Sequence, residues 1–179
     1  MKKIFFIIIL IIPFIFNGCL LFHTVEYEVM PMEKGGGKAT VTIEDIRSDA
    51  LNEKELDEDK KNLFKFMYKS DEFVQQMKDE GKTITNRILS VKNDKLIGKI
   101  DFHFDDIEIV EGIIYEKPFY YLTLAQGDSI ISTNGEIIYG DDYKRIMWDN
   151  SIKILKFKMF SDSFEGQKLI NMAEYFDDK

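Results

Sequence analysis

Residues 83–160 restrict the possible folds more than any other part of this chain, because they contain many β-prone segments joined by very short connections. Parallel neighbours need a crossover of a dozen residues or more, so such connections allow antiparallel pairing only. Asn-Gly between two β-prone segments is a strong hairpin signal, since both residues tolerate positive φ. We therefore expect an antiparallel meander. Its predicted strands are 83–91, 96–104, 107–115, 119–125, 129–133, 136–139, 143–148 and 152–160, with turns at Asn93-Asp94, Gly127-Asp128, Asn134-Gly135 and Gly140-Asp141.

Two further strands are predicted nearer the N-terminus. Residues 24–30 alternate, with Val25, Tyr27 and Val29 on one face. Residues 39–46 also alternate, and the glycines at 35–37 separate the two segments. Alternation with period two is typical of a strand with one buried face. These two segments are expected to pair.

Residues 49–80 are the one long helical stretch, because apolar residues recur there at steps of three, four and seven. Asn52 and Glu55 have the spacing of a capping box, and Ser70 offers a second start that would divide or kink the helix. Residues 165–175 suggest a short C-terminal helix. The predicted class is α+β: a bent antiparallel meander, with a partial barrel as the alternative, covered by one long or kinked amphipathic helix.

The first residues of the chain have the parts of a secretory signal. Lys2 and Lys3 precede the unbroken apolar run Ile4–Phe16, and Gly18 supplies a small residue before Cys19. As a helix this run is about 20 Å long, shorter than the ~30 Å hydrocarbon core of a bilayer. The alternative is an uncleaved anchor, in which the helix extends to Phe22.

The sequence Phe16-Asn17-Gly18-Cys19 resembles the lipobox of bacterial lipoprotein precursors. The resemblance implies cleavage between Gly18 and Cys19, and a lipid, such as a palmitate-containing diacylglycerol, on the Cys19 thiol. It divides the chain into a signal peptide (1–18), a lipidated tether (19–23) and one globular domain (24–179). Leu20 rather than Asp follows the cysteine. By resemblance to the usual sorting rule, this points to the outer membrane in an organism with two membranes, and otherwise to the outer face of the cell membrane.

Cysteine content and charge limit the partners. Cys19 is the only cysteine, so one molecule has no disulfide and no thiolate metal site. The chain has a net charge of −8, and without Lys2 and Lys3 the mature domain carries −10. Such an acidic domain is not attracted to nucleic acid, and we expect its contact with the membrane to come from the lipid on Cys19.

Signals for catalysis and for bound cofactors or metals are weak. The two histidines, His23 and His103, lie far apart in sequence, and His103 is expected to face solvent between two buried phenylalanines. No G-x-S-x-G, phosphate loop or EF-hand pattern occurs. We therefore assign no catalytic, cofactor or metal residues and expect no enzyme. One acidic cluster could bind calcium or act on glycans: Asp101, Asp105, Asp106, Glu108 and Glu111.

Aromatic residues lead to the remaining hypotheses. Phe119, Tyr120 and Tyr121 supply rings to both faces of one strand, and Trp148 ends another. This pattern fits a central strand covered by helix on one side, or a curved sheet around an apolar ligand. We expect a lipid-anchored envelope protein that acts as a non-catalytic interaction or assembly module, with another envelope protein as a candidate partner. The alternatives are a carrier or sensor of a lipid-like ligand and an enzyme acting on glycan or peptide.

Overall fold

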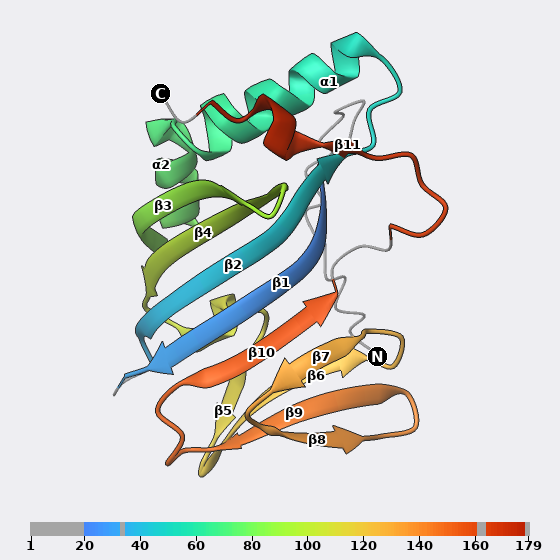
Figure 1. Ribbon diagram of the computed structural model, residues 1–179. Helices are drawn as coiled ribbons and strands as arrows, with labels where there is room; N and C mark the ends of the chain where they lie inside the picture. The colour runs from blue at the N-terminus through green and yellow to red at the C-terminus, as the bar shows by residue number, and fades with distance from the viewer. Residues whose placement is uncertain (1–19, 33–34, 161–163, 178–179) are drawn as a thin grey trace, which may run out of the picture.

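Two antiparallel sheets and a helical layer make up the part of the chain that the computed structural model describes, residues 20–32, 35–160 and 164–177 (Figure 1). Strands outweigh helices, so the predicted α+β class holds in this broad sense. Neither sheet closes into a barrel. The predicted signal peptide (1–18) and the predicted lipidation residue Cys19 lie outside the described residues. Within the described ranges, no helix is long and apolar enough to cross a membrane.

Sheet A has seven strands, ordered β3-β4-β2-β1-β10-β7, with β11 added to the end of β2. The predicted pairing of the first two strands is confirmed, because Tyr27 lies opposite Val41 and Val29 opposite Ala39. β1 already begins at Leu20, so residues 20–23, expected as a tether, are part of the strand. The strands are β1 (Leu20–Pro31), β2 (Gly37–Ser48), β3 (Lys82–Lys92), β4 (Lys95–Phe104), β7 (Ile130–Thr133), β10 (Leu155–Phe160) and β11 (Ile170–Asn171).

Sheet B has four strands, ordered β5-β6-β9-β8. They are β5 (Ile114–Glu116), β6 (Phe119–Ala125), β8 (Glu136–Tyr139) and β9 (Tyr143–Asp149). The predicted hairpins around Asn93-Asp94 and Gly140-Asp141 are confirmed, since β3 pairs with β4 and β8 pairs with β9.

The expected continuous meander is wrong, because the chain crosses between the sheets at two of the predicted hairpin turns. Gly127-Asp128 leads from β6 in sheet B to β7 in sheet A, and Asn134-Gly135 leads back to β8. Asn134 accepts hydrogen bonds at Oδ1 from Trp148 Nε1 (2.9 Å) and Lys156 N (2.8 Å), and its Nδ2 donates to Ile154 O (2.8 Å). These long-range bonds override the local preference for a hairpin.

Gly135 completes this crossing because a side chain has no room there. A Cβ at this position would lie 2.7 Å from Trp148 Nε1, and 2.8 Å from both Ile146 Cγ2 and Met147 O. The Asn-Gly pair is therefore needed for close packing between the two sheets rather than for a turn with positive φ.

The helical layer is not the single long helix predicted. It consists of α1 (Glu53–Lys60), a π-helical segment η1 (Lys61–Met67) and α2 (Asp71–Asp79). Asn52 and Ser70 cap α1 and α2, as their positions in the sequence suggested. The helical layer is interrupted between Met67 and Ser70. At this junction Arg87 Nη1 donates hydrogen bonds to Met67 O (2.9 Å) and Ser70 O (3.0 Å), so the guanidinium takes the place of helical N–H donors to these carbonyl groups.

Three other segments differ from the prediction. Residues 107–115 form a 3₁₀ turn η2 (Ile107–Ile109) and the short β5, because Asp106 caps the turn through Glu108 N (2.9 Å). β10 begins only at Leu155. The expected helix 165–175 is instead β11 followed by a 3₁₀ turn η3 (Met172–Tyr175), capped by Asn171.

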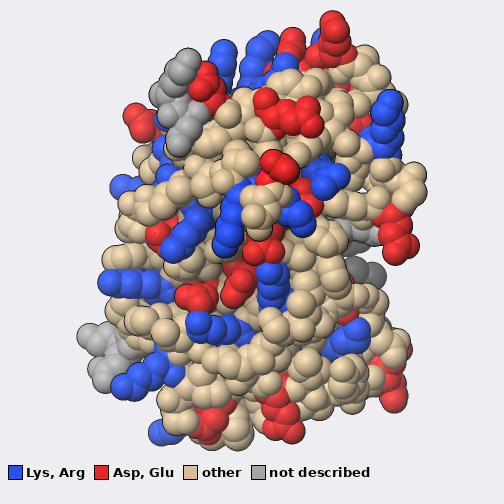
Figure 2. All heavy atoms as spheres, viewed as in Figure 1, with Lys and Arg blue, Asp and Glu red and all other residues tan. Residues whose placement is uncertain are grey.

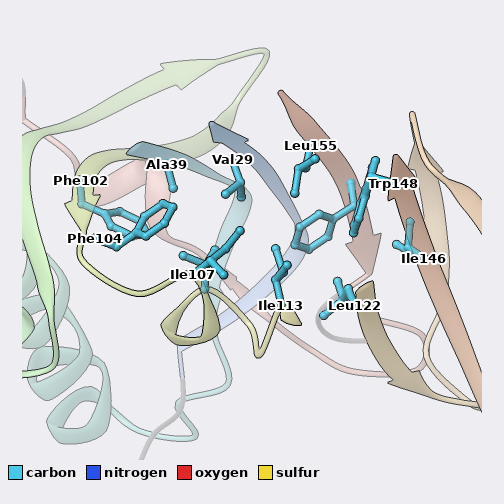
Figure 3. Packing of buried hydrophobic residues seen from close by; sticks show 12 residues of the cluster. Val29, Ala39, Phe102, Phe104, Ile107, Ile113, Leu122, Ile146, Trp148 and Leu155 are labelled. Atoms are coloured by element: carbon cyan, nitrogen blue, oxygen red, sulfur yellow. The ribbon is translucent and has the colours of Figure 1, made fainter. Parts of the chain in front are cut away.

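One face of sheet A carries two separate hydrophobic cores. At the end of β4 near Leu96, the helical layer and η3 cover the sheet. At the end near Phe104, η2 and sheet B cover it, and side chains from both sheets fill the space between them (Figure 3). The buried residues of this inter-sheet core are Val29, Ala39, Phe102, Phe104, Ile107, Val110, Ile113, Leu122, Ile146, Trp148, Leu155 and Phe157.

Candidate functional site

The carboxylates of the acidic cluster predicted from the sequence do not gather into one site in the fold. Asp101 lies on the open face of sheet A, where hydrogen bonds from Thr40 (2.6 Å) and Asn86 (3.1 Å) lower the pKa of its carboxyl group. Asp106 caps η2, and Glu111 accepts a hydrogen bond from Tyr27 (2.6 Å). Among the described residues, no group of three His, Cys, Asp or Glu side chains could hold a metal ion.

The two histidines have separate environments. His103 is exposed on β4 between the buried Phe102 and Phe104, as predicted. The His23 ring packs against Phe160 and Phe164, with ring centroids 5.3 and 5.0 Å away. The two side chains do not form a common site.

A narrow groove lies where the helical layer and η2 approach each other over sheet A. Its floor is apolar and includes Val41 and Ile100, and Phe73 and Met77 of α2 form one wall. Tyr27 and Glu111 lie at its polar side, where burial and then the Glu111 carboxylate raise the pKa of the Tyr27 hydroxyl, so that it remains a hydrogen-bond donor. The groove encloses about 150 Å³. This is room for one small apolar group, whereas ligand pockets usually measure about 300–1,000 Å³.

Two other hollows lie among the described residues. A pocket of about 40 Å³ lies between η1 and sheet A. A larger hollow of about 530 Å³ lies beside Pro31 and Met32 and is lined in part by Tyr115, Tyr120 and Asn150. Its mixture of hydroxyl, amide and apolar groups differs from the apolar lining that a lipid-like ligand needs.

The open face of sheet A is polar and internally paired. Lys158 Nζ lies 2.7 Å from Glu44 Oε2, and Lys156 pairs with Glu28. Figure 2 shows basic and acidic side chains interleaved across the middle of this face. Because the partners in the Lys158–Glu44 and Lys156–Glu28 pairs neutralise each other's charges, this face offers little net charge to attract a binding partner.

The open face of sheet B has a different character. β6 and β9 direct every second residue away from the inter-sheet core, and cross-strand pairs place Tyr121 beside Met147 and Thr123 beside Arg145. We call this surface the outer face of sheet B. Antiparallel sheets with one solvated face usually place polar residues on it, whereas this face is mixed. Apolar side chains lie at its middle, and the cross-strand register also places Glu116, Glu136 and Asp149 on it. Its apolar members are Ile114 (45% exposed), Ile138 (37%), Tyr143 (38%) and the partly buried Phe119, Tyr121 and Met147.

Arg145 lies at the centre of the outer face and is held in place by its neighbours. Its Nε donates to Thr123 Oγ1 (3.0 Å), and its guanidinium lies 5.3 Å from the Tyr121 ring and 5.2 Å from the Tyr143 ring. No carboxylate of the described residues forms an ion pair with it. Arg145 thus presents a positive charge without a direct ion pair within an aromatic frame, with Glu136 as a neighbour on the same face.

Sequence reasoning found the aromatic segment but not this surface. β6 is a central strand with a buried inner face, yet no described helix covers its other side. The expectation of a helical cover was therefore wrong. The available signal was large apolar residues at odd positions of both strands, Phe119, Tyr121, Tyr143 and Met147, with Arg145 among them.

Comparisons with protein-family models, curated proteins and solved structures found no match to this chain. The function must therefore be argued from the chain's own residues.

Proposed function

We propose that the mature chain is a lipid-anchored protein of a bacterial cell envelope, and that it acts as an interaction module that docks a partner protein on the outer face of sheet B. The lipobox resemblance at Phe16–Cys19 supports export and an acyl anchor on Cys19. The membrane would be the outer membrane in an organism with two membranes, and otherwise the outer face of the cell membrane.

The observation that carries the docking proposal is the composition of the outer face. Tyr, Trp, Phe, Met and Arg are enriched at protein interfaces, and a few Tyr, Trp and Arg residues supply most of the binding energy. Tyr121, Tyr143, Met147 and Arg145 lie together here. The aliphatic Ile114 and Ile138 extend the surface on both sides, which favours a protein surface over a sugar as the occupant.

The chemistry of the occupant follows from charge complementarity. A guanidinium framed by tyrosine rings and lacking a carboxylate partner is well placed to receive an acidic side chain, and Arg is suited to two-point contacts with carboxylates. We therefore infer that the partner presents an Asp or Glu carboxylate surrounded by apolar side chains.

Site-specific photocrosslinking tests this proposal. A photoreactive residue replaces Ile138 on the outer face, and a matched one replaces Thr42 on the open face of sheet A. We expect Ile138 to crosslink to a partner protein and Thr42 not to, with Arg145→Glu reducing the product at least tenfold. Reversing the charge of the acidic partner residue at the crosslink should restore the complex with Arg145→Glu.

Two results would overturn the docking proposal. One is a crosslink yield at Ile138 no higher than at Thr42. The other is a product that consists only of two copies of this chain, which would make the outer face a self-association surface.

The lipid anchor has its own test. Cells expressing the full chain are supplied with a palmitate analogue, and we expect label on the wild type but not on Cys19→Ala. Absence of label on the wild type, or label that survives in Cys19→Ala, would contradict the lipoprotein assignment.

A further inference from the structure

The end of sheet A that follows Cys19 consists of several adjoining segments, which we call the anchor end. Leu20 starts β1 directly after Cys19 and pairs with Ser48 at the end of β2, so no spacer separates the lipidation position from the sheet. Ile170 also pairs with Ser48, and Asn171 Nδ2 donates to Asp94 O (2.7 Å) in the turn between β3 and β4. A lipid on Cys19 would hold this end close to the membrane.

Leu51 extends from the anchor end into solvent. It lies three residues after Ser48, in the connection between β2 and α1, and is 91% exposed, more than any other large apolar side chain among the described residues. In Figure 1, α1, β11 and the start of β1 lie at one end of the molecule and sheet B at the other. Leu51 therefore belongs to the membrane-facing end rather than to the docking face.

The exposure of Leu51 is fixed by the hydrogen bonds around it. Ala50 N donates to Ser48 Oγ (3.1 Å), and Leu51 N donates to Glu55 Oε2 (2.8 Å). Glu55 N in turn donates to Asn52 Oδ1 (3.1 Å), which caps α1. The connection is thus held in a defined conformation that points the leucine outward.

An apolar residue directly before a helix cap usually folds back onto the fourth helical residue, the contact known as a hydrophobic staple. That residue is Leu56, which instead packs into the core beneath the helical layer. Leu51 is therefore left without its usual partner, and an exposed leucine of this kind gains free energy wherever it enters an apolar phase.

We propose that Leu51 enters the acyl boundary of the membrane beside the lipid on Cys19, and so fixes the orientation of the domain on the membrane. This inference rests on the proposed lipid anchor. The two acyl chains of a diacylglycerol already give stable anchoring, so the contact of Leu51 sets the orientation of the domain rather than its retention on the membrane. Acidic Glu53 lies beside Leu51 and gains nothing from anionic lipid, so the contact depends on the leucine itself.

The test uses the full-length lipoprotein purified from membranes and reconstituted in phosphatidylcholine vesicles with lipid-borne bromine quenchers. Because Cys19 is the only cysteine and its thiol would carry the lipid, Leu51→Cys introduces one reactive thiol for an environment-sensitive fluorophore. Tyr139→Cys, at a 70% exposed position in sheet B, is the distant control, and Lys92→Cys is the control at the anchor end. We expect severalfold stronger quenching at 51 than at 139, and stronger quenching at 51 than at 92.

The outcomes separate the two proposals. If the protein is acylated and bound to vesicles but the label at 51 is quenched no more than that at 139 or 92, the Leu51 contact is wrong and the anchor stands. If the purified protein carries no acyl group, the anchor proposal fails and this inference fails with it.

Discussion

Sheets A and B each bury one face against the same core and leave the other face open, yet the two open faces are built differently. On sheet A the open face is charged, and its lysines and glutamates form pairs such as Lys158–Glu44. On sheet B aromatic and aliphatic side chains surround Arg145, which forms no ion pair among the described residues, and the carboxylates of this face, such as Glu136, form no ion pair either. The charged open face of sheet A has the composition of a surface that contacts only water. The open face of sheet B contains the residue types that are enriched at protein interfaces.

The largest expected effect on stability comes from a substitution at Gly135, where the chain crosses from sheet A to sheet B. Gly135→Ala places a methyl group 2.7 Å from Trp148 Nε1 and 2.8 Å from Met147 O, which forces the packing apart. We expect a loss of about 2 kcal/mol or more in the free energy of unfolding, at the upper end for overpacked sites. Chemical denaturation of the full chain in mild detergent measures it.

Gly127→Ala is the matched control at the other crossing. Nothing lies within 4 Å of a Cβ at that position, so stability should stay within about 0.5 kcal/mol of the wild type. Equal effects of the two substitutions would show that Gly135 is not a packing constraint.

The second largest effect is expected from substitutions that make the outer face of sheet B polar, like the open face of sheet A. Tyr121→Thr combined with Ile138→Thr removes apolar surface but keeps β-prone residues. Affinity for the docked protein should fall about 30-fold or more, the equivalent of about 2 kcal/mol for a central interface residue. Because Ile138 is exposed and Tyr121 is only partly buried, on the open face of the sheet, the melting temperature should change little.

Stability and binding of this double variant are measured on the same protein preparation. Thermal unfolding gives the stability, and the crosslink yield from a photoreactive residue at a third position on the outer face of sheet B gives the binding. A large drop in melting temperature with unchanged crosslinking would assign the aromatic residues to folding instead. Lys158→Ala on sheet A should leave crosslinking unchanged.

The smallest effect is expected on the open face of sheet A. The hydrogen bond from Lys158, and further the one from Thr24, lower the pKa of the Glu44 carboxyl group below its usual value. The native state thus binds the Glu44 proton less readily than the unfolded state. The resulting stability is present above the unfolded pKa and is lost as the pH falls through the lowered native pKa.

Glu44→Gln should therefore lower the melting temperature slightly at pH 7, by the equivalent of no more than about 1 kcal/mol, because the pair is partly exposed. The difference from the wild type should shrink below about pH 4, where the carboxylate becomes protonated. A difference that stays constant from pH 7 to pH 3 would exclude the ion pair as its cause.

Sequence reasoning succeeded where structure depends on neighbours along the chain. The caps at Asn52 and Ser70 and the turn at Asn93-Asp94 need only local hydrogen bonds or local φ angles, and all were predicted. The pairing of β1 with β2 followed from two alternating segments around a glycine turn.

It failed where distant residues decide the outcome. Asn134-Gly135 resembles a hairpin turn, but contacts with Trp148 and Lys156 make it a crossing between sheets. In the helical stretch the second start at Ser70 was predicted, but the π-helical segment η1 and the hydrogen bond from Arg87 on β3 to Met67 O were not. The outer face of sheet B could not be predicted, since the sequence does not reveal what covers the second side of β6.

The position of β1 within sheet A has a consequence for the order in which this domain can form. β1 is the first strand of the chain but lies between β2 and β10, the latter made of residues 155–160. During synthesis, one edge of β1 therefore stays unpaired until nearly the whole domain has been made. Exposed edges of this kind invite pairing with other chains, and such long-range pairing is slow. A protein with this topology depends on being kept from aggregating until its last long strand arrives.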